Sequence, residues 1–356
     1  MRTGIISFTD RGARLCQELY ERFLGAGDDC QAFVPARFLK AEWEKMGVRA
    51  LKSSALDWAE EMFSQKRALV FVGATGIAVR AIAPWVKDKL TDPPVVVMDE
   101  LGHFAIPLLS GHVGGANELA LQLAGWVGAV PVITTATDIN GLFAVDVFAA
   151  RNKLEITDRQ AAKAVSASLL EGRKVGFFDD FRQLTVWKGL EDGKLPVGFV
   201  SSPCRWNVWI TLHRKGERMA ALSDTSYLCL VPRAVVLGVG CRKGIGEREL
   251  TDRVRQVLEE NHIDESAVKA LATIDIKRQE PAITALAAER GWQLRTYSAD
   301  ELSQVAGSFE ESEFVRAQVK VGNVCERAAC AGGGRLILHK QAGAKITVAA
   351  ALELSL

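Results

Sequence analysis

The sequence predicts an α/β protein with an N-terminal parallel-sheet α/β domain, a small middle α+β region and a C-terminal α/β domain. Short apolar runs of strand length alternate with amphipathic stretches of helix length, an alternation typical of parallel sheets covered by helices. The chain has 356 residues, of which 48% are hydrophobic, and that is enough for more than one buried core. We expect the domains to span residues 1–150, 151–232 and 233–356.

The N-terminal domain is expected to alternate strands with helices along its whole length. Apolar runs predict strands at residues 4–8, 68–72, 95–98 and 130–133. Amphipathic periodicity predicts helices at residues 13–24, 56–63, 77–86 and 117–126. Polar turns follow the strands, at residues 9–12, 73–76, 99–100 and 134–138. Because ligands bind at the carboxyl ends of strands in open α/β sheets, we expect these turns to meet at one edge.

The remaining two regions continue the pattern with shorter elements. In the middle region we expect a helix near residues 158–170 and then short strands and turns over 174–231. In the C-terminal domain we expect strands at residues 234–237, 270–274, 293–296, 335–338 and 345–350. Helices are expected at residues 247–260, 282–290 and 323–331. The segment from Gly238 to Gly244 is expected to be a glycine turn that follows the first of these strands.

The most informative stretch is residues 108–120, which read Leu-Leu-Ser-Gly-His-Val-Gly-Gly-Ala-Asn-Glu-Leu-Ala. An apolar run stops there, and a helix begins near Ala116. The glycines around His112 are Gly111, Gly114 and Gly115, and the neighbouring polar residues are Ser110, Asn117 and Glu118. Glycine lets backbone N–H groups approach an anion, and a helix N-terminus adds positive potential. The stretch therefore predicts a ligand-binding or catalytic site; the alternative is a His112 that only caps the turn.

A second glycine-rich segment, in the C-terminal domain, predicts anion binding. Arg242 and Lys243 lie within it and suit the capture of a carboxylate or phosphate. The segment lacks the P-loop pattern and misses the dinucleotide-binding spacing. Cys241 stands beside both cations, which predicts a lowered thiol pKa. No two histidines stand at metal-ligand spacing, so the sequence predicts no metal site.

Charge and composition exclude several function classes. The net charge is +1, which gives no overall electrostatic support for nucleic-acid binding. No apolar run approaches the roughly 18 residues that span a bilayer, and the N-terminus lacks a signal-peptide pattern. Seven scattered cysteines suit reduced thiols. We therefore expect a cytoplasmic protein with no membrane or nucleic-acid partner. Residues 151–232 hold 13 Lys and Arg against nine Asp and Glu, an excess that suits a polyanionic small substrate.

Several separate motifs carry a resemblance to one enzyme family. In the N-terminal domain they are Gly73-Ala-Thr-Gly-Ile-Ala-Val-Arg-Ala-Ile-Ala-Pro84, Asp99-Glu-Leu-Gly102, Ser110-Gly-His-Val-Gly-Gly-Ala-Asn117 and Thr134-Thr-Ala-Thr-Asp138. In the C-terminal domain they are Gly238-Val-Gly-Cys-Arg-Lys-Gly244, Ile274-Asp-Ile-Lys277, Val324-Cys-Glu326, Lys340 and Thr347-Val-Ala349. Together they resemble the cobalt-precorrin-5A hydrolases of anaerobic cobalamin (vitamin B12) biosynthesis. Val113 is a departure, since isoleucine is common there.

The resemblance implies a hydrolase that acts on a carbon–carbon bond of a carboxylate-rich cobalt tetrapyrrole. Water opens the δ-lactone on ring A of this ring-contracted substrate, and the extruded carbon leaves as acetaldehyde to give cobalt-precorrin-5B. The cobalt arrives inside the substrate, so the resemblance implies no cofactor. Neighbouring enzymes of the cobalamin pathway are a further expected class of partner.

The implied reaction needs a base for water, donors for the oxyanion, a second proton carrier and cations for the peripheral carboxylates. The expected catalytic residues are His112, Asp99, Glu100, Glu118 and Asp138; the alternative for one of Asp99 and Glu100 is a helix cap. The expected substrate-binding residues are Thr75, Gly76, Arg80, Lys89, Ser110, Gly111, Gly114, Gly115, Asn117, Thr135, Arg242, Lys243, Glu326 and Lys340. His112 or Glu118 is expected as the base, with an unperturbed imidazole pKa near 6.5. We expect Asp99 or Glu100 to fix the His112 tautomer, and the substrate to lie between the N- and C-terminal domains.

Two other function classes stay open at this point. One is a corrinoid carrier that binds a tetrapyrrole without reacting, which would release no acetaldehyde. The other is a nucleotide-dependent enzyme that uses residues 73–76 or 238–244 as a phosphate turn; only the true ligand would raise the melting temperature in a thermal-shift scan. A separate alternative for His112 is axial ligation of the substrate cobalt.

Overall fold

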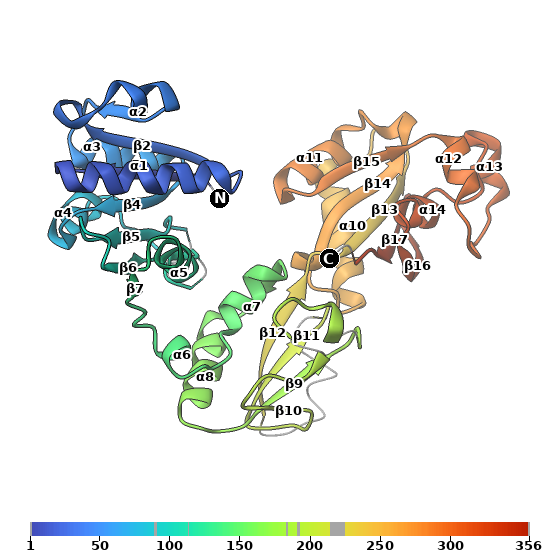
Figure 1. Cartoon of the computed structure of the whole chain (residues 1–356). Helices are drawn as coiled ribbons and strands as arrows, with labels where there is room; N and C mark the ends of the chain where they lie inside the picture. Colours follow the sequence, from blue (N-terminus) through green and yellow to red (C-terminus); the bar gives the residue numbers. More distant parts are fainter. Residues whose placement is uncertain are drawn as a thin grey trace. The chain divides into compact units, whose positions relative to one another are not determined.

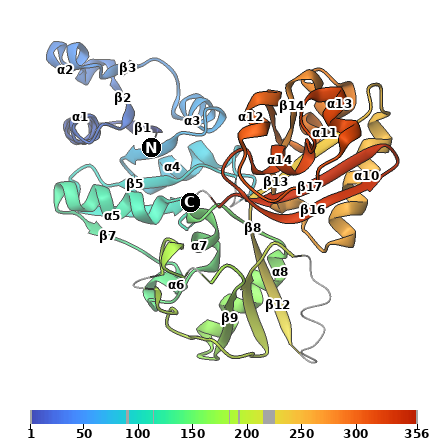
Figure 2. The same cartoon turned by 90° about the vertical axis from the view of Figure 1, so that its right-hand side faces the viewer.

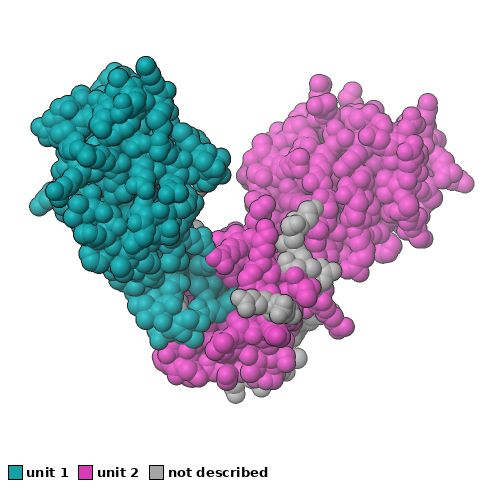
Figure 3. Space-filling view, viewed as in Figure 1, with its two compact units in different colours: residues 1–147 teal, residues 148–356 magenta. Residues whose placement is uncertain are grey.

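A computed structural model describes residues 2–88, 91–112, 114–182, 184–190, 193–213 and 225–354 of the chain. The chain divides into two compact units, Met1–Val147 and Phe148–Leu356 (Figure 3). The described residues form a seven-stranded sheet in the first unit and two five-stranded sheets in the second. None of the described helices is both long and apolar enough to cross a membrane. The α/β class is confirmed, and the domain boundary near residue 232 stays a prediction.

The first unit alternates strands and helices from its first residues. Its strands are β1 (Arg2–Ser7), β2 (Asp29–Pro35), β3 (Arg49–Leu51), β4 (Ala68–Val72), β5 (Val95–Met98), β6 (Phe104–Leu109) and β7 (Val130–Pro131). Its helices are α1 (Asp10–Gly25), α2 (Ala41–Met46), α3 (Ala55–Ser64), α4 (Thr75–Ile82), α5 (Ala116–Val127), α6 (Ala136–Ile139) and α7 (Val145–Arg151), the last of which continues into the second unit. Strands β2, β3 and β6 were not among the expected strands.

The sheet of the first unit is buried on both faces (Figure 1). Alternate residues of β4 and β5 pack against α1 and α5 on one face and against α3 and α4 on the other. Every residue of these two strands is buried. A strand covered on both faces reads as a continuous apolar run, which explains the sequence Ala-Leu-Val-Phe-Val of β4.

Strand direction divides the motifs of the first unit between two edges of the sheet. The order is β3-β2-β1-β4-β5-β6-β7, and the strands from β3 to β5 are parallel. Strand β6 runs antiparallel to β5, with Leu109 opposite Val95, and β7 is parallel to β6. The carboxyl ends of β6 and β7 therefore lie at the amino edge of the other strands. The expectation that all the polar turns meet at one edge is wrong, because it assumed a wholly parallel sheet.

The first sheet of the second unit packs against the helix formed by Arg159–Leu170. Its strands are β8 (Leu154–Ile156), β9 (Val175–Asp179), β10 (Phe199–Val200), β11 (Trp206–Ile210) and β12 (Ser226–Pro232), in the order β10-β9-β11-β12-β8. All neighbours are parallel except β8 and β12. Asp158 caps helix α8 (Arg159–Leu170), since its side chain accepts from the amides of Gln160 and Ala161. The expected helix and short strands of this region are confirmed.

The second sheet of this unit has the order β15-β14-β13-β17-β16. Its strands are β13 (Val235–Cys241), β14 (Val268–Ile274), β15 (Gln293–Tyr297), β16 (Arg335–Gly343) and β17 (Ile346–Leu352). Its helices are α10 (Glu247–Glu260), α11 (Pro281–Arg290), α12 (Ala299–Gln304), α13 (Glu313–Val319) and α14 (Cys325–Cys330). Strands β13 to β15 are parallel, and β17 is antiparallel to both of its neighbours. One face packs against α10 and α11, the other against α12 and α14.

The glycines of β13 serve close packing rather than a turn. Residues 238–241 belong to the strand, so the expected turn is confined to the residues after Cys241. Helix α14 lies directly against β13 (Figure 2). A Cβ on Gly238 would overlap the carbonyl oxygen of Cys325 and lie 2.8 Å from the amide nitrogen of Ala329. A phosphate has no room at Gly238, which removes part of the basis for the nucleotide alternative.

Candidate active site

A tight loop between β6 and α5 carries His112. The amides of Ala116 and Asn117 donate to the carbonyls of Ser110 and Gly111, at 3.1 and 3.0 Å, so the loop closes on itself. Ser110 and Gly115 both have a positive φ, 55° and 87°, a region in which glycine carries no steric cost. A Cβ on Gly114 would lie 2.7 Å from the carbonyl oxygen of Ser110. The glycines are therefore required by the backbone, in addition to any role toward a ligand.

Five side chains from four segments of the first unit meet around this loop, and we call them the His112 cluster: His112, Asn117, Thr135, Asp138 and Asp146. His112 Nε2 lies 2.9 Å from Asp138 Oδ2, and its Nδ1 lies 3.5 Å from Asp146 Oδ1. The Asn117 amide donates to Asp138 at 2.6 Å and to Thr135 Oγ1 at 3.0 Å. The structure thus brings together four of the expected residues and adds Asp146.

The two carboxylates raise the pKa of the imidazole. An imidazole donates from both ring nitrogens only when it is protonated. The bond to Asp146 is the main cause that raises the pKa of His112; burial opposes it, and the charges of Asp146 and Asp138 add to it. Burial alone would raise the pKa of Asp146, but its bond to His112 lowers it below the ordinary value. The expectation of an unperturbed imidazole pKa is therefore wrong.

Exposure within the cluster differs from one side chain to the next. The side chain of His112 is 15% exposed, that of Asp146 30% and that of Asp138 38%. A ligand would therefore reach the Asp138 carboxylate most readily. Among the described residues, the amides of Gly111 and Gly114 have no backbone acceptor. These two N–H groups flank His112 and suit a developing oxyanion.

Asp99 and Glu100 belong to the opposite edge of the sheet. Asp99 closes the turn between β5 and β6 by accepting the amides of Leu101, His103 and Phe104, at 2.8 to 2.9 Å. Glu100 accepts from the Thr9 hydroxyl at 2.6 Å, at the start of α1. The prediction that either carboxylate fixes the His112 tautomer is wrong, since the antiparallel β6 carries His112 to the other edge.

The remaining expected residues of the first unit lie outside the His112 cluster. Thr75, Gly76 and Arg80 are exposed on α4, where Arg80 donates to the Gly76 carbonyl at 3.1 Å. The Ser110 hydroxyl donates to the Asp92 carbonyl at 2.9 Å, which fastens the loop to the start of β5. Glu118 is exposed in the first turn of α5. Lys89 lies outside the described residues.

The second unit contains a cavity of about 750 Å³, which we call the C-terminal cavity. It lies where β13 and β14 end and where β16 turns into β17. It brings together three of the expected residues, Arg242, Lys243 and Lys340. The sequence analysis missed Lys277, although it belongs to a motif that carried the resemblance.

Two expectations for this region need correction. Glu326 is fully buried, and its carboxylate accepts the amides of Glu310 and Lys340 and the side-chain amide of Asn323. It holds the cavity wall together and has no exposed surface with which to contact a substrate. Burial raises the pKa of the Cys241 thiol; Lys277 lowers it and Glu280 raises it further. The net shift is upward, so the expected lowering is wrong.

The pH dependence of stability follows from the raised pKa of His112. The folded pKa lies above the unfolded value near 6.5, so the contribution is fully present below that pH and is lost as pH rises through the folded pKa. We expect the melting-temperature difference between the wild type and His112→Asn to shrink as pH increases from about 6 to about 9. His103→Asn is the matched control, because the His103 side chain is 65% exposed. A difference that grows with pH would contradict the raised pKa of His112.

Comparisons with known proteins point to one family along most of the chain. Residues 57–138 match the family described as Cobalamin synthesis G N-terminal, residues 143–232 match Cobalamin biosynthesis central region, and residues 235–351 match Cobalamin synthesis G C-terminus. A cobalt-precorrin-5A hydrolase of Salmonella typhimurium is 39% identical over 76% of this chain and 77% of its own. One from Priestia megaterium is 28% identical over 98% and 94%. A solved cobalamin biosynthesis protein G homolog from Sulfolobus solfataricus covers 99% of this chain and 97% of its own, with 21% identity and a TM-score of 0.41.

Proposed function

The chain belongs to the cobalamin synthesis G family of cobalt-precorrin-5A hydrolases, and on this premise we propose that its His112 cluster is the hydrolytic centre. The observation that carries the proposal is that the two ring nitrogens of His112 face the carboxylates of Asp138 and Asp146, an arrangement that favours the protonated imidazole. Such a group holds a proton ready for a leaving oxygen, and the more exposed Asp138 can take one from water. The substrate is a cobalt tetrapyrrole of the cobalamin pathway, and the cobalt enters as part of it.

In the first step the lactone opens, with Asp138 as the base and His112 as the acid. Asp138 takes a proton from water as the water oxygen forms a bond to the lactone carbonyl carbon. The amides of Gly111 and Gly114 donate to the oxyanion that develops. The acyl–oxygen bond then breaks, and the departing alkoxide receives the proton of His112 Nε2. The products of this step are a carboxylic acid and an alcohol on the extruded carbon, with Asp138 protonated and His112 neutral.

In the second step the carbon–carbon bond breaks, and His112 and Asp138 return to their starting protonation states. Neutral His112 takes the proton of the alcohol, and an oxygen lone pair becomes the second bond of the new carbonyl group. The electron pair of the broken carbon–carbon bond passes to the macrocycle carbon. Acetaldehyde departs, and Asp138 returns its proton to the macrocycle carbon. Asp146 positions the imidazole throughout, because its carboxylate faces Nδ1. Asn117 donates to Asp138 and holds that carboxylate toward Nε2.

Acetaldehyde release from cobalt-precorrin-5A tests the proposed function. The purified full chain should release one acetaldehyde for each substrate consumed, measured by coupled reduction with alcohol dehydrogenase. A corrinoid carrier would bind the same substrate and release none. A thermal-shift scan with ATP and NAD serves as the control for the nucleotide alternative, since a ligand stabilises only a protein that binds it.

A further inference from the structure

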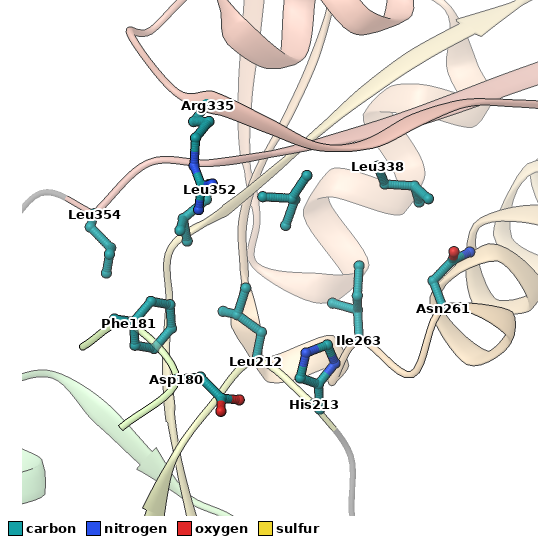
Figure 4. A pocket seen from close by; sticks show the side chains of 11 residues that line it. Asp180, Phe181, Leu212, His213, Asn261, Ile263, Arg335, Leu338, Leu352 and Leu354 are labelled. Atoms are coloured by element: carbon teal, nitrogen blue, oxygen red, sulfur yellow. The ribbon is translucent and has the colours of Figure 1, made fainter. Parts of the chain in front are cut away.

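Two cavities of the second unit differ in the ligand chemistry that they suit. One, of about 360 Å³, is lined mainly by leucine and isoleucine side chains and carries single charges of both signs, on Asp180 and Arg335 (Figure 4). Its Asp180 carboxylate already accepts from Trp209 and Thr211. The C-terminal cavity is larger, and no acidic residue is among the described residues that line it. The C-terminal cavity therefore differs from the smaller one in its excess of positive charge.

A large part of the C-terminal cavity wall is apolar. It includes aliphatic side chains from the end of β14 and the turn after it, from α13, from the residue before α14 and from the start of β17, namely Ile274, Ile276, Val315, Val319, Val324 and Ile346. Ile276 is 66% exposed. Apolar side chains that line a concave surface lower the free energy of a ligand with a flat apolar face.

Five cations surround these walls: Arg242, Lys243, Lys277, Lys340 and Lys345. Two of them are held in place by carboxylates outside the lining. Lys277 pairs with Glu280 at 3.0 Å and is 14% exposed, and Lys340 pairs with Glu310 at 2.8 Å and is 21% exposed. Arg242 and Lys345 are exposed, and neither has a hydrogen-bond or ion-pair partner for its side chain among the described residues.

Glu280 fixes the loop that carries two of the cations. Its side chain is 5% exposed, and its Oε1 accepts the Gly244 amide at 2.7 Å. Burial alone would raise the pKa of Glu280, but Lys277 and the Gly244 amide lower it below the ordinary value. The turn after β13 is thereby tied to the Lys277 ammonium, so the positive charges are preorganised before a ligand binds.

We propose that the C-terminal cavity binds a flat, apolar ligand through several carboxylates on its periphery. The inference rests on the proposed function, because the cobalt tetrapyrrole proposed as substrate is itself a flat ligand with carboxylates on its periphery. The cavity binds such a ligand through charge and apolar contact, and it takes no part in proton transfer. Its affinity therefore depends on Arg242 and Lys345 and is independent of His112.

Uroporphyrin, which carries eight carboxylates, is the probe that tests the cavity. The full chain is titrated with it, and binding is followed by the quenching of porphyrin fluorescence. Arg242→Gln combined with Lys345→Gln should weaken binding about tenfold, because each cation offers a charge-assisted hydrogen bond to a carboxylate. Arg248→Gln combined with Arg255→Gln removes the same charge from α10, none of whose residues is among the described residues that line the cavity, and should leave the affinity unchanged. A retained melting temperature shows that each variant folds.

The outcomes separate this inference from the proposed function. His112→Asn should bind uroporphyrin as the wild type does while it loses acetaldehyde release. If the cavity variant binds as tightly as the wild type, or if the wild type does not bind uroporphyrin, the inference is overturned and the hydrolytic centre is unaffected. If ATP displaces uroporphyrin with the same dependence on Arg242 and Lys345, the cavity is a phosphate site and the inference is also overturned. If uroporphyrin binding needs both cations but the wild type releases no acetaldehyde, only the proposed function fails.

Discussion

His112→Asn should lower the rate of acetaldehyde release about 10²-fold or more while KM changes little. Asparagine can still donate to Asp138, so the loop and its neighbours keep their places. It cannot carry the proton that the departing alkoxide needs, and it cannot take the proton of the alcohol in the second step. Because proton transfer by His112 is lost from both steps, kcat should fall. The affinity for substrate should remain, since His112 is not proposed to bind the substrate.

His103→Asn is the control for this variant, since it removes a histidine from the opposite edge of the same sheet. It should retain wild-type turnover. A His112→Asn enzyme that turns over within a few-fold of the wild type would make His112 a structural residue of the loop. The alternative in which His112 ligates the substrate cobalt would need one ring nitrogen to leave its carboxylate. A visible spectrum of the bound substrate that shifts with the wild type and not with His112→Asn would support ligation and contradict proton transfer.

Gly238→Ala should destabilise the second unit by about 3 kcal/mol or more, because overpacking at a backbone contact has no side chain that can move aside. The added methyl group meets the backbone of α14 at both Cys325 and Ala329. To remove this overlap, α14 would have to move away from β13. The buried side chains between α14 and the sheet would then lose contact. Hydrogen exchange at the amides of β13 and β14 measures the loss within this unit.

Gly125→Ala is the matched control, since a Cβ there meets no heavy atom within 4 Å. Gly125 lies inside α5, where alanine is the better helix former, so this variant should be neutral or more stable than the wild type. Unchanged exchange protection in Gly238→Ala would contradict the close packing of α14 on β13.

The local pattern predicted most elements because strands and helices differ in period and length. Apolar runs identified β4 and β5, and the glycine and histidine motif identified the loop between β6 and α5. The same pattern does not determine the direction in which a strand runs within the sheet. Nothing in residues 104–109 distinguishes a strand that runs parallel to β5 from one that runs antiparallel, and that single choice moved His112 to the other edge. Four of the five residues of the His112 cluster were predicted, and the pairing of their side chains was not.

Two further misses have separate physical causes. Asp146 lies 34 positions after His112 in the sequence, and no motif or spacing connects the two; only the fold brings α7 to the loop. Gly238 was interpreted as part of a turn because glycine is common in turns. In the structure it is a strand residue, and its small size is needed by a helix that packs from elsewhere in the chain. Glycine alone does not distinguish these two uses.

The reversal of the chain at Asp99 has a consequence for how mutational screens of this protein should be interpreted. Three backbone amides depend on one carboxylate there, and the turn that they form sends β6 toward the edge where the reaction is proposed to occur. A screen that reads only product formation would rank Asp99 beside His112, and would count it as a member of the chemical machinery. Its influence is architectural: lost product would be matched by lost folded protein, whereas His112→Asn would leave a folded chain that does not react.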